Sequence, residues 1–299
     1  MRTFNVGVIG ATGMVGQRFL RLLDNHPWFN VTVLAASERS ANKTYFNAVG
    51  NKWAFDCPIP EKYAQMLVLD AEKDIELIAK RVDFVFCAVN MDKTKIRALE
   101  EKYAKMEIPV VSNNSAHRFT PDVPMVIPEI NPEHVEVIPA QRRRLGTKRG
   151  FIAVKSNCSL QSYVPLLHPL KKFGIKSAAV CTYQAISGAG KTFQTMPEIL
   201  DNVIPYIGGE EEKSENEPLK IWGELKNGEI VGIDCKTELC YEPTAGEYTE
   251  YNITLTDTVK LRVNEKLEEA QDYEAPEKLE EKILGVIKGG LMFMSYFIL

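Results

Sequence analysis

The sequence lacks the cysteine pattern of a disulfide-bonded or zinc-binding protein. Its six cysteines follow no framework spacing, and Cys235 and Cys240 lack the His or Cys partners that a zinc site needs. Cys87 and Cys181 lie inside apolar, strand-like runs and are expected to be buried thiols. We therefore expect free thiols and no metal site.

The sequence also lacks a large excess of charge. A net charge of −4 over 299 residues argues against a chain built to hold nucleic acid or an anionic membrane. The basic cluster of Arg142–Arg144, Lys148 and Arg149 is expected on an exposed loop rather than on a nucleic-acid surface. The chain length and a hydrophobic content of 45% predict two domains with a substantial core.

An export signal and a long apolar run are absent as well. Met1 is followed by three residues and then a strand, with no signal-peptide layout. The apolar run 291–299 is far too short to cross a bilayer. Together with free thiols, these features predict a cytoplasmic protein without a membrane partner.

What is present at the start is the pattern of a dinucleotide-binding domain. The buried-strand pattern Asn5–Ile9 precedes the spacing G-x-x-G-x-x-G over 10–16 and helical periodicity over 17–23. Such a strand, glycine turn and helix let backbone amides approach a pyrophosphate at the positive end of a helix. The spacing is a variant of the usual fingerprint, so its place between strand and helix gives it weight. The predicted cofactor contacts are Gly10, Thr12, Gly13, Met14 and Val15.

The residues after the second predicted strand, Val31–Ala36, indicate which dinucleotide binds. An NAD site usually has an acidic residue at this strand tip, for the ribose hydroxyls. Here the tip is Ser37, with Arg39, Ser40 and Lys43 close by, which suits the 2′-phosphate of NADP. The alternative interpretation, favoured by Glu38, is a solvated turn.

Further alternation of strands and helices predicts the fold class. Strands are expected at Val82–Val89, Pro109–Ser112 and Met125–Pro128, with a helical segment over 91–105. This alternation implies a doubly wound, mostly parallel sheet. The chain is thus predicted to be α/β, with a Rossmann-like dinucleotide-binding domain over 1–150.

The second half has a different pattern. A long strand is expected over Ser177–Ile186 and another over Tyr251–Thr256, followed by a charged stretch over 264–282. We interpret residues 151–299 as an α+β catalytic, substrate-binding and dimerisation domain. Its sheet would support a homodimer or homotetramer.

Cys158 is the most informative residue of the sequence. A short β-prone run ends in small polar residues, then comes Cys158, and then 160–164 can continue as a helix. The amides of a helix N-terminus stabilise thiolate over thiol, and the thiolate is the nucleophile that attacks acyl groups. The alternative is a buried, inert thiol.

Seven short sequence strings together carry a resemblance to one protein family. The chain resembles the aspartate-β-semialdehyde dehydrogenase family, of the archaeal and fungal type. The strings run in family order over about residues 1–225, and they are Gly10–Gly16, Ala35–Ser40, Ser112–Phe119, Val126–Asn131, Ser156–Ser159, Tyr183–Gly190 and Asp201–Lys213.

The resemblance implies a mechanism and a set of site residues. In the family, the cysteine attacks aspartyl β-phosphate and expels phosphate, and hydride from NADPH reduces the thioester to the aldehyde. By resemblance, Cys158 is the nucleophile and Gln184 orients the acyl-enzyme. The implied substrate or phosphate contacts are Arg118, Asn157, Glu210 and Lys213, with Glu217 and Lys220 as alternatives to the last two. Ser187 and Gly188 are the further implied cofactor contacts.

The sequence departs from the family downstream of this set. The family has an Arg that binds the substrate carboxylate and a His that is the acid-base partner of the cysteine. In a loose alignment, Glu242 and Glu247 stand at these places, with Arg262 as a remote substitute, and all four histidines lie upstream. We also expect the family's C-terminal cofactor-closing element to be missing, with Gly289-Gly290 and a short apolar tail in its place.

The leading hypothesis is an NADP-dependent aspartate-semialdehyde dehydrogenase, which supplies lysine, threonine and methionine synthesis. A malonyl-CoA reductase-like enzyme is one alternative. N-acetyl-γ-glutamyl-phosphate reductase fits less well, because its cysteine usually lies in a Gly-Asn-Pro-Gly-Cys-type string. A catalytically impaired or non-catalytic NADP-binding relative is the alternative that the absent Arg and His favour.

Overall fold

The computed structural model describes residues 3–173, 175–180, 182, 184–202, 207–233, 248–254 and 258–264. Its β-strands are β1 (Phe4–Ile9), β2 (Phe29–Ala36), β3 (Val68–Asp70), β4 (Phe84–Cys87), β5 (Val110–Ser112), β6 (Ile152–Val154), β7 (Ile175–Val180), β8 (Glu224–Lys226), β9 (Glu229–Val231), β10 (Tyr248–Thr254) and β11 (Thr258–Asn264). Its α-helices are α1 (Met14–Leu22), α2 (Tyr45–Val49), α3 (Glu61–Ala64), α4 (Ile75–Ala79), α5 (Lys93–Lys105), α6 (Ile138–Leu145), α7 (Leu160–Leu167) and α8 (Glu210–Ile221). Its 3-10 helices are η1 (Gly50–Lys52), η2 (Pro132–Val137), η3 (His168–Phe173), η4 (Ile186–Ala189) and η5 (Pro197–Ile199).

The first half forms a parallel sheet of six strands in the order β3-β2-β1-β4-β5-β6. This order reverses direction next to β1, which creates the topological switch point at which such sheets bind dinucleotides. The predicted doubly wound α/β domain is confirmed. Because β6 pairs with β5, the sheet extends past the predicted boundary at residue 150, and the boundary itself stays a prediction.

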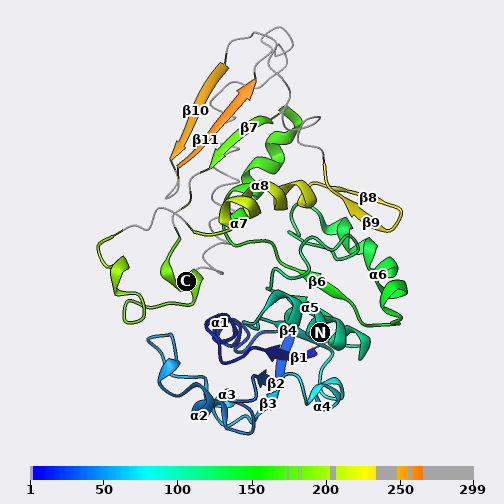
Figure 1. Ribbon diagram of the computed structural model, residues 1–299, viewed down its shortest axis with the longest axis vertical. Coiled ribbons are helices and arrows are strands. Elements are labelled where there is room, and N and C mark those ends of the chain that lie inside the picture. The colour runs from blue at the N-terminus through cyan, green and yellow to red at the C-terminus, as the bar shows by residue number, and fades with distance from the viewer. Residues whose placement is uncertain are drawn as a thin grey trace.

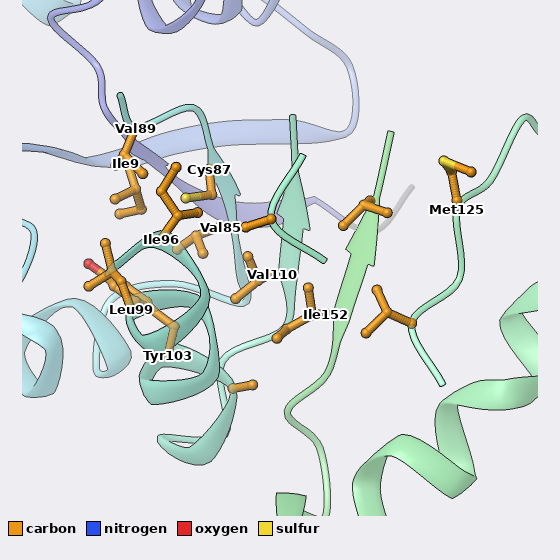
Figure 2. Close-up of a cluster of buried hydrophobic side chains, with 14 of the residues drawn as sticks. Ile9, Val85, Cys87, Val89, Ile96, Leu99, Tyr103, Val110, Met125 and Ile152 are labelled. Atoms are coloured by element: carbon orange, nitrogen blue, oxygen red, sulfur yellow. The ribbon is translucent and has the colours of Figure 1, made fainter. Parts of the chain in front are cut away.

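Both faces of this sheet are covered by helices. On one face, Ile9, Val85 and Val110 belong to a buried cluster with Leu99 and Tyr103 of α5 (Figure 2). The opposite face packs against α1, α2 and α3 through a second cluster, whose members include Val6, Val8, Leu20, Leu34, Tyr45 and Tyr63. Strand residues point alternately to the two faces, so near-continuous apolar strands are what this arrangement requires.

The second half adds an antiparallel sheet in the order β10-β11-β7 and the hairpin β8-β9. In Figure 1, α7 and α8 lie between this sheet and the six-stranded sheet. Buried residues of α7, together with Ile221 and Trp222 at the end of α8, join the first core cluster. The α+β character predicted for the second half is therefore confirmed, and α7 and α8 are anchored to the first sheet.

Three predicted segments differ in the structure. Met125–Pro128 is not a strand, since Met125 makes only one isolated bridge to Val154, and the flanking Pro124 and Pro128 have no N–H to extend it. Arg142–Arg144 lies in α6 rather than in a loop, and Gly146 ends that helix at φ 72°. The long strand predicted over Ser177–Ile186 ends at Val180, and Ile186 begins η4.

Among the described residues, no helix combines the length and the apolar content that a bilayer crossing requires.

Candidate active site

Cys158 lies in the turn between β6 and α7, and its side chain is exposed. The Cys158 carbonyl accepts the N–H of Gln161 at 3.2 Å, and the Ser159 carbonyl accepts the N–H of Ser162 at 3.1 Å. The first turn of α7 thus begins at the cysteine, as the sequence predicted. An accessible thiol at the start of a helix is placed where a thiolate is stabilised.

Asn157 holds this turn and also ties it to α8. Its side-chain oxygen accepts the N–H of Ser159 at 2.9 Å and the hydroxyl of Ser159 at 2.6 Å. Its side-chain nitrogen donates to the carboxylate of Glu210 at 2.9 Å. The amide is 5% exposed, so in the structure Asn157 orients the residues around Cys158.

Glu210, the first residue of α8, is the point where several predicted site residues converge. Its carboxylate accepts hydrogen bonds from Asn157, from Gln184 at 3.0 Å and from Lys213. Burial alone raises the pKa of Glu210, but the bonds from Lys213, Gln184 and Asn157 outweigh it and lower the pKa. An ionised Glu210 therefore fixes the amide of Gln184 beside the turn that carries Cys158.

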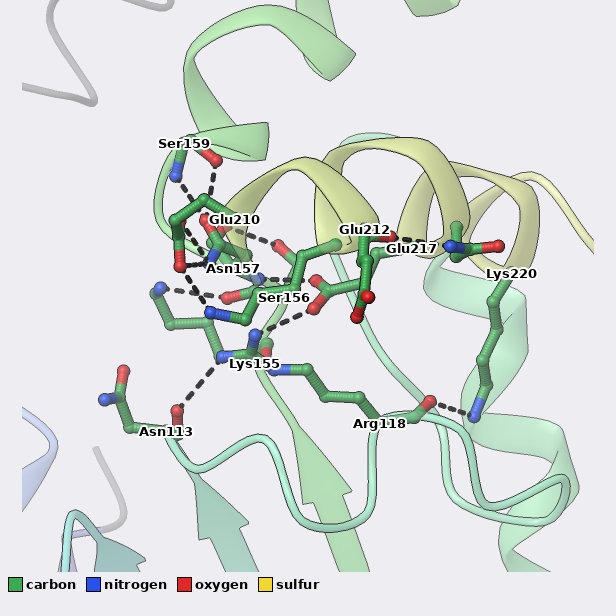
Figure 3. A network of polar contacts seen from close by, with 12 residues as sticks. Asn113, Arg118, Lys155, Ser156, Asn157, Ser159, Glu210, Glu212, Glu217 and Lys220 are labelled. Atoms are coloured by element: carbon green, nitrogen blue, oxygen red, sulfur yellow. Dashed lines mark hydrogen bonds and ion pairs between the residues drawn. The ribbon is translucent and has the colours of Figure 1, made fainter. Parts of the chain in front are cut away.

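Arg118, predicted to contact phosphate or substrate, is held on the loop after β5. Its Nε donates to the carbonyl of Lys155 at 3.0 Å, one Nη to Glu217 at 2.8 Å and the other Nη to the carbonyl of Asn113 at 3.3 Å. Figure 3 shows these residues together with Asn157 and Glu210 in one polar network. A guanidinium has five N–H donors, so these three bonds leave two for an anion.

Lys155 is a site residue that the sequence reasoning did not single out. Its N–H donates to the carbonyl of Ser112, and its Nζ donates to the carbonyl of Ser156 at 3.1 Å. Burial lowers the pKa of Lys155 and outweighs the opposing attraction of the nearby Cys158 and Glu217. The signal was its position three residues before the cysteine, where a cation favours the thiolate.

The dinucleotide turn has the close packing that its glycines were expected to serve. Gly10 has φ +88°, and a Cβ there would lie 2.4 Å from the carbonyl oxygen of Ala88. A Cβ on Gly16 would lie 2.2 Å from the Gly10 carbonyl oxygen. Gly13 is the N-cap of α1, and no side chain caps that helix. The turn therefore leaves the start of α1 open to a pyrophosphate.

Two side chains that the sequence did not indicate stabilise this turn by hydrogen bonds. The buried Tyr45 hydroxyl donates to the carbonyl of Ala11 at 2.9 Å. The side-chain nitrogen of Gln17 donates to the carbonyls of Thr12 and Lys52, both at 3.0 Å. Met14 and Val15 follow as the first residues of α1.

The tip of β2 exposes Ser37 and Arg39. Nζ of Lys43 donates to the carbonyl of Arg39 at 2.9 Å, which brings the lysine to the same turn. The carboxylate of Glu38 is paired with Lys73, and this pairing raises the pKa of Lys73. With its one acid neutralised, the turn around Ser37 and Ser40 fits an anionic group.

Ser187 and Gly188, the other predicted cofactor contacts, lie on the exposed η4 just after Gln184. Glu242 and Glu247, which a loose alignment places where the family has Arg and His, lie outside the described residues. The four histidines lie upstream of α8, and the buried His117 and His134 bond to Thr120 and to the carbonyl of Gly223, respectively.

The basic cluster is engaged within the chain. Arg144 pairs with Asp122 and Glu101, Arg149 with Asp83, and Arg142 stacks over Phe151. In the part of the chain that the structure describes, no group of three His, Cys, Asp or Glu side chains is arranged to hold a metal ion.

We expect Cys158 to be the most reactive thiol. It is exposed, Cys57 is half-buried, and the buried Cys87 has its pKa raised well above the usual value by burial and by Glu100. Because the thiolate reacts, limiting iodoacetamide should modify Cys158 at least about tenfold faster than Cys87. Mass-spectrometric mapping of the folded protein measures this, and dominant labelling of any other cysteine, including Cys235 or Cys240, would contradict it.

The family model described as semialdehyde dehydrogenase, NAD binding domain, matches residues 5–138, and the model described as semialdehyde dehydrogenase, dimerisation domain, matches residues 167–236. Aspartate-semialdehyde dehydrogenase of Methanothermobacter thermautotrophicus is 47% identical over 76% of this chain and 63% of the relative. The enzyme of that name from Archaeoglobus fulgidus is 42% identical over 83% of this chain and 70% of the relative.

A solved structure shows the same likeness. The crystal structure of aspartate semialdehyde dehydrogenase with NADP from Candida albicans matches at a TM-score of 0.67 and 38% identity, over 79% of this chain and 65% of that chain. The chain spans 63% of the length of the Methanothermobacter relative.

Proposed function

Because the chain belongs to the aspartate-semialdehyde dehydrogenase family, we propose that it catalyses the reductive dephosphorylation of aspartyl β-phosphate to aspartate semialdehyde with NADPH. One observation carries the proposal: the accessible thiol of Cys158 lies at the start of α7, and Asn157 beside it shares the Glu210 carboxylate with Gln184. The names of the relatives favour this reaction over that of a malonyl-CoA reductase.

The chemistry begins with the Cys158 thiolate, which attacks the acyl carbon of the substrate. A carbon–sulfur bond forms, the bond from that carbon to the phosphate oxygen breaks, and phosphate leaves with the electron pair. Gln184, fixed by Glu210, orients the resulting thioester, and the two remaining N–H groups of Arg118 bind the phosphate. Lys155 lies close enough to Cys158 for the two groups to interact electrostatically.

The cofactor residues fit NADP. The amides at the start of α1 and the glycine turn Gly10–Gly16 would hold the pyrophosphate, and Ser37, Arg39 and Ser40 the 2′-phosphate. Ser187 and Gly188 would complete the site from η4. When bound, the nicotinamide supplies the hydride that reduces the thioester, and loss of the thiolate then releases the aldehyde.

The remaining proposals concern the oligomeric state, the cellular role and the location of the protein. The match to a dimerisation domain over 167–236 supports a homodimer or homotetramer. We further propose a role in amino-acid biosynthesis, in the cytoplasm, with small molecules as partners.

The proposed function is tested in the oxidative direction. We expect NADP⁺ reduction with aspartate semialdehyde to require inorganic phosphate, because phosphate must release the acyl group from Cys158. The matched assay replaces phosphate and aspartate semialdehyde with coenzyme A and malonate semialdehyde. Reduction of NADP⁺ in the second assay alone would contradict the proposal.

The cofactor preference gives a second test. Arg39→Ala should weaken NADPH binding about tenfold, since a hydrogen bond to a charged group contributes on the order of 1.5 kcal/mol. NADH has no 2′-phosphate, so its affinity should not change. Calorimetric titration of both cofactors measures this. Equal losses for the two, or tighter binding of NADH by the wild-type protein, would overturn the assignment of this turn.

A further inference from the structure

One face of α8 carries four charged residues at a spacing of three, four and three, namely Glu210, Lys213, Glu217 and Lys220. This spacing places them in line along a helix. Glu210 accepts hydrogen bonds from Asn157 and Gln184, and Lys213 pairs with Glu210, as described above. Glu217 and Lys220 are buried, with exposed fractions of 0% and 6%, respectively.

Glu217 connects three separate segments of the chain. One carboxylate oxygen accepts the guanidinium of Arg118 at 2.8 Å, and the other accepts the backbone N–H of Asn157 at 2.6 Å. Arg118 lies on the loop after β5 and Asn157 immediately before Cys158, so one carboxylate joins the two (Figure 3).

Lys220 holds the backbone of the loop that carries Arg118. Its ammonium donates to the carbonyls of Arg118 and Thr120, both at 2.7 Å, and of Val123 at 2.8 Å. With its three donors used in this way, Lys220 fixes the backbone of the Arg118 loop and has no donor left for a substrate. The guanidinium itself is oriented by Glu217 together with the carbonyls of Lys155 and Asn113.

A buried ion pair is weak evidence for stability, because removing both charges from water costs as much as their attraction returns. The geometry of the Glu217–Arg118 pair indicates a role in positioning rather than in stability. Its two bonds set the distance between an anion-binding guanidinium and the turn of the nucleophile, which are separated along the chain by 39 residues from Arg118 to Asn157. Catalysis is sensitive to this kind of placement.

We propose that Glu217 is a positioning residue that fixes the position of the Arg118 guanidinium relative to Cys158, so that the phosphate of the substrate binds beside the thiol. The proposal rests on the proposed function of this site. Glu217 does not contact the substrate and transfers no proton. It binds one N–H group of Arg118, the carbonyls of Lys155 and Asn113 bind two more, and two remain for the phosphate.

The test is the Glu217→Gln variant, which keeps the shape of the side chain but removes its charge. In the 299-residue chain, iodoacetate alkylates Cys158, and inorganic phosphate at the Arg118 site should slow this anionic reagent. The phosphate concentration that halves the rate should rise at least about tenfold in Glu217→Gln, because a charge-assisted hydrogen bond is lost. This measurement needs no turnover.

Further variants separate positioning from folding. Glu217→Asp keeps the charge and should recover part of the phosphate effect, whereas Glu211→Gln, an exposed change on the same helix, should match the wild-type protein. In turnover, Glu217→Gln should raise KM for phosphate more than KM for aspartate semialdehyde. Its NADPH affinity should stay unchanged, which also shows that the variant is folded.

The outcomes are distinguishable. If phosphate slows alkylation of the wild-type protein and of Glu217→Gln with the same concentration dependence, the positioning role is wrong and the proposed function stands. If phosphate has no effect on the wild-type protein, the anion site beside Cys158 is wrong, and the proposed function fails with it.

Discussion

Replacement of Cys158 with alanine is expected to abolish turnover and to leave NADPH binding unchanged. Among the described residues, the other thiols are those of the half-buried Cys57 and the buried Cys87. Loss of a nucleophile can cost as much as about 10⁶-fold in rate. We expect a fall of at least about 10³-fold, measured as phosphate-dependent NADP⁺ reduction, because removing the thiol leaves only binding and orientation.

The matched control for this variant is Cys57→Ala. Cys57 is half-buried and lies between η1 and α3, in the first half of the chain, so its loss should leave turnover as it is. Calorimetric titration with NADPH checks that Cys158→Ala is folded. Residual turnover of Cys158→Ala close to that of Cys57→Ala would show that another group carries the acyl intermediate.

The second large effect is an expected gain of turnover in a double variant. In the loose alignment, Glu242 and Glu247 stand where the family has the carboxylate-binding Arg and the acid-base His. A missing acid-base group costs about 10²–10⁴-fold, so we expect the wild-type chain to turn over at least about 10²-fold below an intact site. A carboxylate facing the substrate carboxylate adds repulsion. The double variant Glu242→Arg, Glu247→His should raise turnover by about 10²-fold.

The control is the double variant Glu242→Gln, Glu247→Gln, which removes the repulsion but supplies neither function. Its gain should be much smaller, and confined to KM for aspartate semialdehyde. Steady-state kinetics of the three proteins under the same conditions measure the difference. Full activity of the wild-type chain would show that another group supplies the base, and the interpretation of Glu247 would then be wrong.

Local features of the sequence predicted the elements that carry the chemistry. The glycine turn at Gly10–Gly16 and the thiol of Cys158 lie where the sequence placed them, because each depends on residues next to it in the chain. The same holds for the helix over 91–105, observed as α5. The secondary structure of short strands and basic stretches does not follow from local sequence, because pairing partners and packing decide it.

The misplaced elements illustrate this limit. Met125–Pro128 has a strand-like composition, but Pro128 and the preceding Pro124 cannot donate to a ladder, so only a bridge forms with Val154. The basic segment at Arg142 is helical because partners elsewhere in the chain, such as Asp122, neutralise its charges and Gln141 is buried against Ile152. Residues distant in sequence supplied these contacts.

The sequence by itself determined the alternation of strands and helices in the first half, the dinucleotide turn and the position of the nucleophile, because these follow from hydrophobic periodicity and from backbone requirements of single residues. Only the tertiary structure decided how the charged groups around Cys158 are used. Sequence reasoning left Glu217 and Lys220 as an alternative to Glu210 and Lys213 for the substrate. In the fold, Glu217 binds Arg118, 99 residues away, and Lys220 binds backbone carbonyls. A buried charge takes whichever partner the packing of distant segments brings to it, and no local pattern records that choice.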